Sequence, residues 1–459
     1  MKKSLKILTL LCFILVPNLN SQFMIGTTEV DTTSVLMGLD TPWEIRWGPD
    51  DEIWLTERYG RVSRFDPESK ELTVLLTIDA VHEQSEAGLL GMTFHPDFPE
   101  TSFVYLVYNY FEDNRIKERL VRYDYTGTEL VSEEILMDDI GGSGNHNGSR
   151  LEFGPEGKLY MTTGDAVNAS LAQDPESLNG KILRINPDGS IPSDNPFDNS
   201  YVYTLGHRNP QGLVFAPSGI LYSSEHGPAS DDELNIIEEG RNYGWPDVKG
   251  FCDGASETEF CNENNVREPL IAWTPTLAVA GIDYYDNPAI PEWQNSILMT
   301  TLKESEFVVM NLSGDGSSVM NDAYHFNNWW GRLRDVCISP DGRVFIATSN
   351  RDGRGDVRSG DDRILEIKAV SDPVGMNSHD KNFRVFPNPV IGDYLTIESP
   401  YSSGQITIKV YDISGKLMSV TTTQSKEEKI RIDFPFEEGT YLVELRKGER
   451  SFRGIVLKQ

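Results

Sequence analysis

Short strands with one buried face recur along most of the chain and are separated by tight polar turns. Apolar and polar residues alternate in segments such as WEIRW, SRLEF and GLVF, which is the period-two pattern of half-buried strands. A turn of the Pro-(Asp/Glu/Ser)-Gly type follows each of these strands, and a second strand comes next. The turn prolines repeat at intervals near 60 residues, except for a last interval about twice as long: Pro49, Pro96, Pro155, Pro217 and Pro340.

A sixth copy of this unit fills the long interval. It is GIDYYDNPAIPEWQNSILMTT, residues 281–301, with Pro288 or Pro291 at its turn. Each copy continues into a further strand, for example GRVSRFD, GKILRIN or DRILEI. A strand-only repeat of this length is typical of propeller blades, which cannot bury both faces alone. We therefore predict an all-β protein with a six-bladed β-propeller over residues 27–370. A β-sandwich is the alternative, but it leaves the repeat unexplained.

The two ends of the chain show other patterns. Three lysines and a short apolar run that ends at Pro17 are typical of a secretory signal peptide, which we place at residues 1–22. A buried first strand or helix is the alternative. Residues 371–380 are polar and aperiodic, as in a linker. Short alternating strands in residues 381–459 predict a small antiparallel β-sandwich. No other apolar run is long enough to span a bilayer, so we expect no membrane span.

The charge of the chain excludes one class of partner. Asp and Glu number 71 against 41 Lys and Arg, which gives a formal net charge of −30. Nucleic acid binding needs a basic surface, so we expect no nucleic acid partner.

Cysteine positions predict one disulfide bond. Cys252 and Cys261 lie nine residues apart in a polar loop, and an exported protein folds where disulfides form. A metal pair is the weaker alternative, because no His or further Cys lies nearby. Cys337 falls in an apolar alternation and is expected to be a buried free thiol.

Polar loops between blade strands contain the candidate chemistry, because propeller sites lie on loops around a central channel. His146 lies between glycines in GSGNHNGS, and a neutral imidazole can act as a general base near pH 7. Arg208 in GHRNPQG suits a carboxylate or a developing oxyanion. Ordinary loop hydrogen bonds are the alternative for both residues. Glu86 and Asp165 are either site carboxylates or turn caps.

Two charged clusters add candidates. Acidic residues that include Glu233 follow Gly227 and Pro228, and such oxygens suit calcium, although a solvated acidic loop is the alternative. Arg332 and Arg334 lie two apart on a strand and project from one face. Two guanidinium groups on one face repel each other unless an internal Asp or a bound polyanion lies between them. Lys303, in the preceding blade, would join them.

Several long motifs together resemble one enzyme family. GLLGMTFHPDF, HNGSRLEFGPEGKLYMTTGD, LGHRNPQGLVFAPSGILYSSEHGP, GRNYGWP and RDVCISPDGRVFIAT occur in this order. They resemble the soluble pyrroloquinoline quinone (PQQ)-dependent glucose and aldose sugar dehydrogenases over about three quarters of the chain. The resemblance implies a six-bladed propeller enzyme with PQQ and Ca²⁺ as cofactors. It also implies a sugar substrate oxidised at its anomeric carbon to the lactone, and an external electron acceptor.

The resemblance also implies roles for individual residues. His146 is similar to the general base that deprotonates the anomeric hydroxyl, and Asp165 to a carboxylate near it. Arg208 and Asn209 resemble the pair that contacts the quinone oxygens. Three cations resemble those that bind the PQQ carboxylates: Lys303, Arg332 and Arg334. Gly227 and Pro228 resemble residues whose backbone carbonyl groups hold the calcium ion bound to PQQ. Glu233 and Tyr243 resemble positions at which some members bind additional structural calcium ions.

Three positions depart from the glucose-oxidising members. Asn145 replaces Asp before the base, while Glu86 and His226 each replace Gln. These changes alter the sugar contacts and the charge around the cofactor, so they weaken the expectation of glucose preference more than that of the reaction type. The alternative functions are a binding propeller without catalysis and a calcium-dependent lactonase-type hydrolase.

The tail resembles a second family. FRVFPNPV, VYDISGKL and GTYLVELRKGERSFRGIVLK are similar to the sorting domain of the type IX secretion system. That resemblance implies recognition by a secretion machinery and an extracellular or cell-surface location. A carbohydrate-binding sandwich is the alternative.

Overall fold

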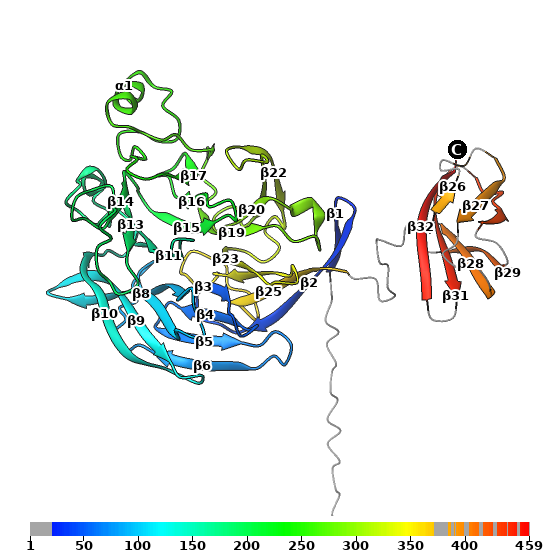
Figure 1. Cartoon of the computed structure of the whole chain (residues 1–459), viewed down its shortest axis with the longest axis horizontal. Coiled ribbons are helices and arrows are strands. Elements are labelled where there is room, and N and C mark those ends of the chain that lie inside the picture. The colour runs from blue at the N-terminus through cyan, green and yellow to red at the C-terminus, as the bar shows by residue number, and fades with distance from the viewer. Residues whose placement is uncertain are drawn as a thin grey trace, which may run out of the picture. The chain divides into compact units, whose positions relative to one another are not determined.

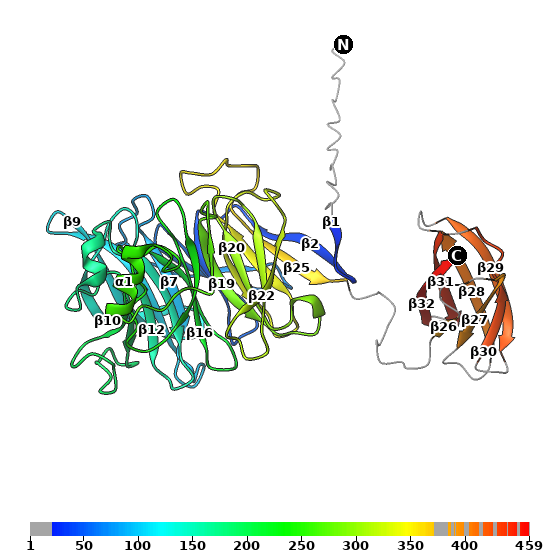
Figure 2. The same ribbon diagram turned by 90° about the horizontal axis from the view of Figure 1, so that it is seen from above.

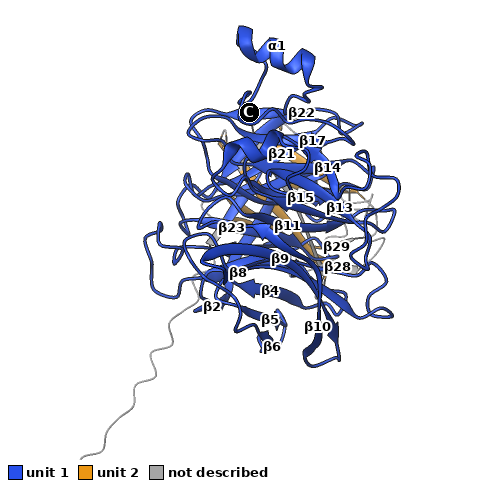
Figure 3. Ribbon diagram, turned by 90° about the vertical axis from the view of Figure 1, so that its left-hand side faces the viewer, with its two compact units in different colours: residues 1–369 blue, residues 370–459 orange. Residues whose placement is uncertain are grey.

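The structure is a computed structural model in which the chain separates into two compact units, residues 1–369 and 370–459 (Figure 3). It describes residues 21–370 and then 384–386, 390, 392–398, 404–412, 416–425, 429–437, 439–447 and 450–458. Most of the predicted signal peptide, all of the predicted linker and the Pro-Asn-Pro run at 387–389 lie outside the described residues.

Residues 21–370 form six antiparallel sheets arranged as a ring (Figures 1 and 2). The first strand of each sheet contacts the first strand of the next, and the last contacts the first again. These inner strands are β3 (Pro42–Trp47), β7 (Leu89–Phe94), β11 (Gly148–Phe153), β15 (Pro210–Phe215), β19 (Val279–Tyr285) and β23 (Leu333–Ile338). The predicted six-bladed propeller is confirmed.

The middle strands of the sheets follow the predicted repeat. Each predicted turn proline lies between an inner strand and the second strand of its sheet. The second strands are β4 (Ile53–Glu57), β8 (Phe103–Glu112), β12 (Leu159–Thr163), β16 (Leu221–Glu225), β20 (Ser296–Thr301) and β24 (Val344–Thr348). The third strands are β5 (Arg61–Phe65), β9 (Arg115–Tyr125), β13 (Lys181–Ile185), β17 (Asp232–Ile237), β21 (Phe307–Leu312) and β25 (Arg363–Ala369).

The outermost strands were not predicted. Five of the sheets end in β6 (Leu72–Thr77), β10 (Leu130–Gly141), β14 (Val202–Leu205), β18 (Ile271–Trp273) and β22 (Val319–His325). The sixth sheet takes its outer strands from the start of the unit. There, β2 (Thr28–Met37) pairs with β25, and β1 (Ser21–Ile25) pairs with β2. Hydrogen bonds between the two ends of the unit therefore close the ring.

Apolar side chains fill the space between neighbouring sheets. Trp54 of β4 is fully buried against Leu89 and Met92 of β7. Ile53 of β4 and Phe345 of β24 belong to one buried cluster, so the sixth sheet packs on the first in the same way. Each large side chain that is fully buried contributes roughly 1.5–3 kcal/mol to folding, so these seams hold the blades in fixed positions around the axis.

Helical segments are few in the described part of the propeller. They are η1 (Ala169–Gln173), α1 (Ala255–Glu263) and η2 (Pro291–Trp293). Helix α1 buries none of its residues and protrudes from the unit (Figure 3). A disulfide joins Cys252, just before α1, to Cys261 within it, with Cα atoms 6.4 Å apart. The predicted disulfide is confirmed, and Cys337 is a buried free thiol as predicted.

The inner strands carry charged side chains into the channel. Glu44, Arg46, Arg150, Asp283 and Asp335 line a cavity of about 160 Å³. One nitrogen of Arg150, Nη1, lies 2.7 Å from Glu44 Oε2 and 3.0 Å from Asp335 Oδ2. Burial raises the pKa of the Asp283 carboxyl to about 7. The channel is therefore packed with paired charges.

The described residues of the C-terminal unit form two antiparallel sheets. One consists of β26 (Arg384–Phe386), β27 (Tyr394–Glu398) and β30 (Lys429–Asp433). The other has the order β29 (Leu417–Ser425), β28 (Gly404–Asp412), β31 (Gly439–Lys447) and β32 (Arg450–Lys458). Leu395 and Ile397 of the first sheet share a buried core with Ile408, Val410 and Val443 of the second. The predicted small sandwich is confirmed. The sequence pattern missed β26 and β29, and the described side chains of β29 are mostly exposed.

Candidate functional site

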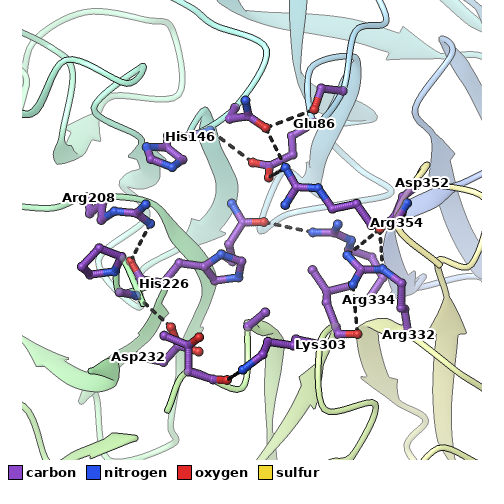
Figure 4. Close-up of a pocket in the computed structure, with 18 of the residues that line it drawn as sticks. Glu86, His146, Arg208, His226, Asp232, Lys303, Arg332, Arg334, Asp352 and Arg354 are labelled. Carbon is purple, nitrogen blue, oxygen red and sulfur yellow. Dashed lines mark hydrogen bonds and ion pairs between the residues drawn. The ribbon is translucent and has the colours of Figure 1, made fainter. Parts of the chain in front are cut away.

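A cavity of about 480 Å³ lies at the mouth of the channel where the inner strands begin (Figure 4). Loops before β7, β11, β15 and β23 and after β16 and β20 contribute to its wall. Most of the predicted site residues line it: Glu86, His146, Arg208, Gly227, Pro228, Lys303, Arg332 and Arg334. Residues more than 200 positions apart in the sequence are thus brought to one place.

His146 lies on the cavity wall and is hydrogen-bonded to Asp165, which is buried behind it and does not line the cavity. His146 Nδ1 lies 2.8 Å from Asp165 Oδ1. Asp165 is 1% exposed, and the backbone N–H of Val167 also donates to it. A carboxylate only accepts hydrogen bonds, so Nδ1 carries the imidazole proton and Nε2 keeps its lone pair. The pair is arranged for His146 to accept a proton at Nε2.

The backbone around His146 is held in an unusual conformation. His146 has a φ of +61°, in the left-handed region. Gly164 packs so close to it that an added Cβ would lie 1.9 Å from the His146 carbonyl oxygen. The glycine of the TTGD motif therefore allows the His146 loop to rest on the end of β12, next to Asp165.

Arg208 lines the cavity, whereas Asn209 lies beneath it. Glu225 Oε1 accepts hydrogen bonds from the backbone N–H groups of both residues. The side-chain oxygen of Asn209 accepts a 3.1 Å bond from Gly148 N, which ties the Arg208 loop to the His146 loop. Arg208 Nε and Asn209 Nδ2 are buried and have no hydrogen-bond partner among the described residues. Of these two donors only that of Arg208 belongs to a residue that lines the cavity, so Arg208 is the one suited to a ligand with acceptor oxygens.

Arg334 is a buried cation with little compensation. It is 5% exposed and donates one side-chain bond, from Nη1 to Gln211 Oε1 at 3.0 Å. Its Nε atom has no partner within the described part of the chain. Burial lowers the pKa of Arg334 to about 10, so the group is still charged at neutral pH. A buried cation of this kind favours an anionic ligand.

The other two predicted cations have partners. The guanidinium of Arg332 forms an ion pair with Asp352, with Nη2 and Oδ2 2.7 Å apart. Lys303 donates to the carbonyl of Thr276 at 2.7 Å, and its side chain is 49% exposed. The whole cavity has six cationic side chains and three carboxylates: Arg58, Arg208, Lys303, Arg332, Arg334 and Arg354 against Glu86, Asp232 and Asp352. In a chain of net charge −30, this excess of positive charge indicates an anionic ligand.

Glu86 lies in this positive field. Its Oε2 atom accepts a 3.2 Å bond from His146 N, and its Oε1 atom lies 3.3 Å from Arg354 Nη2. Burial alone would raise the pKa of Glu86, but His226, the His146 amide and Arg354 outweigh it and hold the pKa below its usual value. Arg354 Nη2 also donates to Asn145 Oδ1 at 3.0 Å. Two of the three departures from the glucose-oxidising members, Glu86 and Asn145, therefore share one arginine.

Gly227 and Pro228 line both this cavity and a small neighbouring one of about 10 Å³, which Glu233 and Tyr243 also line. Asp232 Oδ1 accepts from Gly227 N at 2.8 Å. Burial, with Glu225 nearby, raises the pKa of Glu233 to about 8. The hydroxyl of Tyr243 donates a 2.6 Å hydrogen bond to the carbonyl oxygen of Ile236. Within the described residues no three His, Cys, Asp or Glu side chains cluster as a metal site, so a cation here would depend on backbone carbonyls.

Sequence reasoning missed several residues of the site. They are Arg58, Gln211, Asp352, Arg354 and, behind Asp165, Trp245. Trp245 stands in the quoted motif GRNYGWP, and the charged loop RDGRGDVR contains Asp352 and Arg354. The high charge of the RDGRGDVR loop could have indicated these residues, because charged side chains near the start of a blade strand can reach the mouth of the channel.

A closed ring of six sheets with a positively charged cavity beside a His–Asp pair defines a β-propeller protein whose site suits an anionic ligand. It belongs to the glucose/sorbosone dehydrogenase family, whose model matches residues 39–358. Residues 384–458 match the model of a secretion system C-terminal sorting domain. No helix within the described part of the chain is long and apolar enough to cross a membrane.

Known relatives cover most of the propeller. The chain is 32% identical to quinoprotein glucose dehydrogenase B of Acinetobacter calcoaceticus, over 79% of this chain and 94% of that one. It is 30% identical to an aldose sugar dehydrogenase of Escherichia coli, over 74% and 96% of the two chains. The PQQ-bound aldose sugar dehydrogenase of Streptomyces coelicolor has a similar structure, with a TM-score of 0.65 and 33% identity over 74% of this chain and 98% of that one.

Proposed function

We propose that the protein oxidises an aldose at its anomeric carbon to the lactone with PQQ and Ca²⁺, and passes the electrons to an external acceptor. The observation that carries this proposal is the position of His146, paired with Asp165, on the wall of a cavity rich in cations. Relatives that are named as quinoprotein or PQQ-bound sugar dehydrogenases support it.

The residues of the cavity fit PQQ, which carries three carboxylates. The cavity has a volume of about 480 Å³, which is in the usual range for a small-molecule site. Arg334 and Arg208 each keep a buried Nε donor without a partner in the described structure. Lys303, Arg332 and Arg334 would hold the carboxylates, and Arg208 the quinone oxygens.

The surroundings of Gly227 fit a hard cation held by carbonyl groups. A Cβ atom at Gly227 would lie 2.0 Å from Ser230 O and 2.5 Å from Asp231 O, so carbonyl oxygens crowd this position. Calcium accepts carbonyl ligands as well as carboxylates. We assign the calcium to the Gly227 and Pro228 carbonyls, with Glu233 and Tyr243 as candidates for a second ion. The second assignment is weaker, because the Tyr243 hydroxyl and both Glu233 oxygens already have partners.

The chain's own residues would act on the sugar as follows. His146 Nε2 takes the proton of the anomeric hydroxyl as the carbon is oxidised. Asp165 fixes the imidazole tautomer and stabilises the positive charge that forms. Arg208 donates to the oxygen on which negative charge develops. When bound, PQQ supplies the two-electron acceptor and Ca²⁺ polarises it.

The two alternative functions are less well supported. A lactonase-type hydrolase needs a metal-bound water held by carboxylates, and the described residues contain no such cluster. A binding propeller has no use for a buried carboxylate that orients an imidazole, whereas buried Arg334 suits a binding protein and an enzyme equally.

Reconstitution tests the proposal. Purified apo-protein is mixed with PQQ and Ca²⁺ and assayed with aldoses and an acceptor dye. We expect dye reduction that needs both cofactors. If no sugar reduces the dye and no quinone absorbance stays with the protein through gel filtration, the proposal is wrong.

We further propose export through an N-terminal signal peptide, followed by the type IX secretion machinery acting on residues 381–459. The match to the sorting-domain family supports the second step. In a host with this machinery, deletion of residues 381–459 should keep the protein inside the cell. Secretion of the shortened chain at the normal level would contradict it.

A further inference from the structure

A second cavity, here called the side basin, adjoins the cavity described above. It has a volume of about 350 Å³ and is bounded by segments within residues 302–305, 327–332 and 350–358. The two cavities share Leu302, Lys303, Arg332 and Arg354 as wall residues. The two cavities are therefore adjacent at these four residues, and Arg354 reaches both of them.

The wall of the side basin is polar. Leu302 contributes its one large apolar side chain among the described lining residues. An apolar or aromatic electron carrier would leave the other wall groups without partners, at a cost in free energy. A ligand rich in hydroxyl or carboxylate oxygens would satisfy them, and the continuation of a sugar chain has this chemistry.

Cations outnumber carboxylates on the wall of the basin, but Lys303 pairs with Glu304 at 3.1 Å, Arg332 with Asp352 and Arg354 with Glu86. Four cations line the basin against the two carboxylates of Glu304 and Asp356: Lys303, Arg332, Arg354 and Arg358. The guanidinium of Arg358 donates to neutral oxygens, at 2.8 Å to Trp329 O and at 3.0 Å to Asn328 Oδ1. Arg115, also on the surface, instead pairs with Asp139 at 2.9 Å. Arg358 therefore has charge left for an anion.

Arg354 connects the basin to the reacting end of the site. It is 57% exposed, and its Nη2 atom lies 3.0 Å from the side chain of Asn145, which directly precedes His146. A sugar whose anomeric carbon lies at His146 would pass Arg354 before it reached Arg358. Two guanidinium groups four residues apart on one loop thus line the path of the substrate, and paired guanidinium groups bind carboxylates well.

We propose that the side basin is a subsite for an acidic sugar residue. The substrate would be an oligosaccharide whose reducing-end residue lies beside His146 and whose next residue is a uronic acid bound by Arg358 and Arg354. This inference rests on the proposed function and adds the class of substrate to it.

The test measures KM for two disaccharides, digalacturonic acid and the neutral galactose disaccharide, which differ in their carboxylates. The protein is loaded with PQQ and Ca²⁺, and reduction of an acceptor dye is the readout. We expect a KM about tenfold lower for the acid, a difference that shrinks between 0.05 and 0.5 M NaCl because salt screens exposed charges. Equal KM values for the two sugars would overturn the inference.

Variants locate the effect. Arg358→Gln should raise the KM for the acid about tenfold and change that for the neutral sugar less than twofold, while Arg358→Lys should restore part of the loss. Arg115→Gln removes the same charge outside both cavities and should change neither value. A thermal unfolding temperature equal to that of the native chain shows that the Gln variant folds. If Arg358→Gln affects both sugars equally, the inference is wrong.

A failure of the proposed function remains distinguishable. If no sugar reduces the dye, the proposed dehydrogenase activity fails, and calorimetric titration of the same protein with digalacturonic acid then tests the subsite alone. Binding that is lost in Arg358→Gln supports the subsite, and no binding to the native protein overturns it.

Discussion

The indole N–H of Trp245 donates a 2.9 Å hydrogen bond to Asp165 Oδ2, while His146 uses the other oxygen of the same carboxylate. The ring of Trp245 also lies 5.3 Å from the guanidinium carbon of Arg208. Trp245 thus contacts both Asp165 and Arg208 without lining the main cavity. In the proposed reaction Trp245 would therefore act as a positioning residue for His146.

Replacement of Trp245 by Phe should lower kcat about tenfold and leave KM within about twofold. The aromatic volume stays, but the hydrogen bond to a charged carboxylate is lost, and such a bond is worth roughly 1.5–3 kcal/mol. The kcat–pH profile should shift as well, because Asp165 then holds the imidazole less firmly. Trp329→Phe, at an exposed position, is the control. An unchanged kcat and pH profile in Trp245→Phe would refute the positioning role.

His146→Ala should keep PQQ binding and lose most turnover. The cations that hold the cofactor remain, whereas the proton acceptor is gone, and general bases contribute about 10²–10⁴-fold. Quinone absorbance after gel filtration measures binding, and dye reduction measures kcat. His82→Ala, in the loop before β7 and outside both cavities, controls for the loss of a histidine. Turnover at the native rate in His146→Ala would remove its assignment as the base.

Arg334→Met should make the apo-protein more stable and bind PQQ about 100-fold more weakly. A buried cation without an acid partner at hydrogen-bond distance costs free energy, and a hydrophobic side chain of similar length removes that cost. The same cation is worth several kcal/mol once an anion lies against it. Thermal unfolding with and without PQQ measures both effects. A lower apo Tm together with unchanged PQQ affinity would contradict this prediction.

The free energy of unfolding should fall as the pH rises from 5 to 8, partly because the buried carboxyl group of Asp283 loses its proton. Burial raises its pKa in the folded protein to about 7 from an ordinary value of 3.8. The folded state therefore holds this proton more tightly than the unfolded chain, and the stabilisation it gives is lost as the pH rises through 7. Asp283→Asn should flatten this slope and raise Tm at pH 8.

Asp315→Asn is the matched control for that experiment. Hydrogen bonds from Ser313 and Ser317 lower the pKa of Asp315 to about 2, so its contribution changes only in acid. The slope between pH 5 and 8 should stay the same in this variant. An equal change of slope in both variants would rule out Asp283 as the cause.

The number of blades could be predicted because its signal is local. Pro49 and its equivalents mark turns between strands only a few residues apart, so each turn is encoded where it forms. The outer strands give a weaker signal, since β22 is mostly exposed and shows no apolar alternation. The pairing of β2 with β25 joins segments more than 300 residues apart, and no local pattern contains it.

The site was predictable where residues lie in long motifs and not where they act through contacts across the ring. His146 and Arg334 stand in motifs that resemble a known family. Arg354 belongs to the site because it forms an ion pair with Glu86, which lies 268 positions earlier in the chain. Trp245 matters through Asp165, 80 positions away. Such relationships exist only once the blades are assembled.

The pairing of β2 with β25 also determines when during folding the propeller ring can close. The ring stays open until residues near 369 are free to meet those near 28, so an exported chain completes its propeller late. The cavity wall draws on the first sheet through Arg58 and on the last through Arg332 and Arg334. The complete cavity wall therefore exists only once the ring has closed, in whatever compartment that closure takes place.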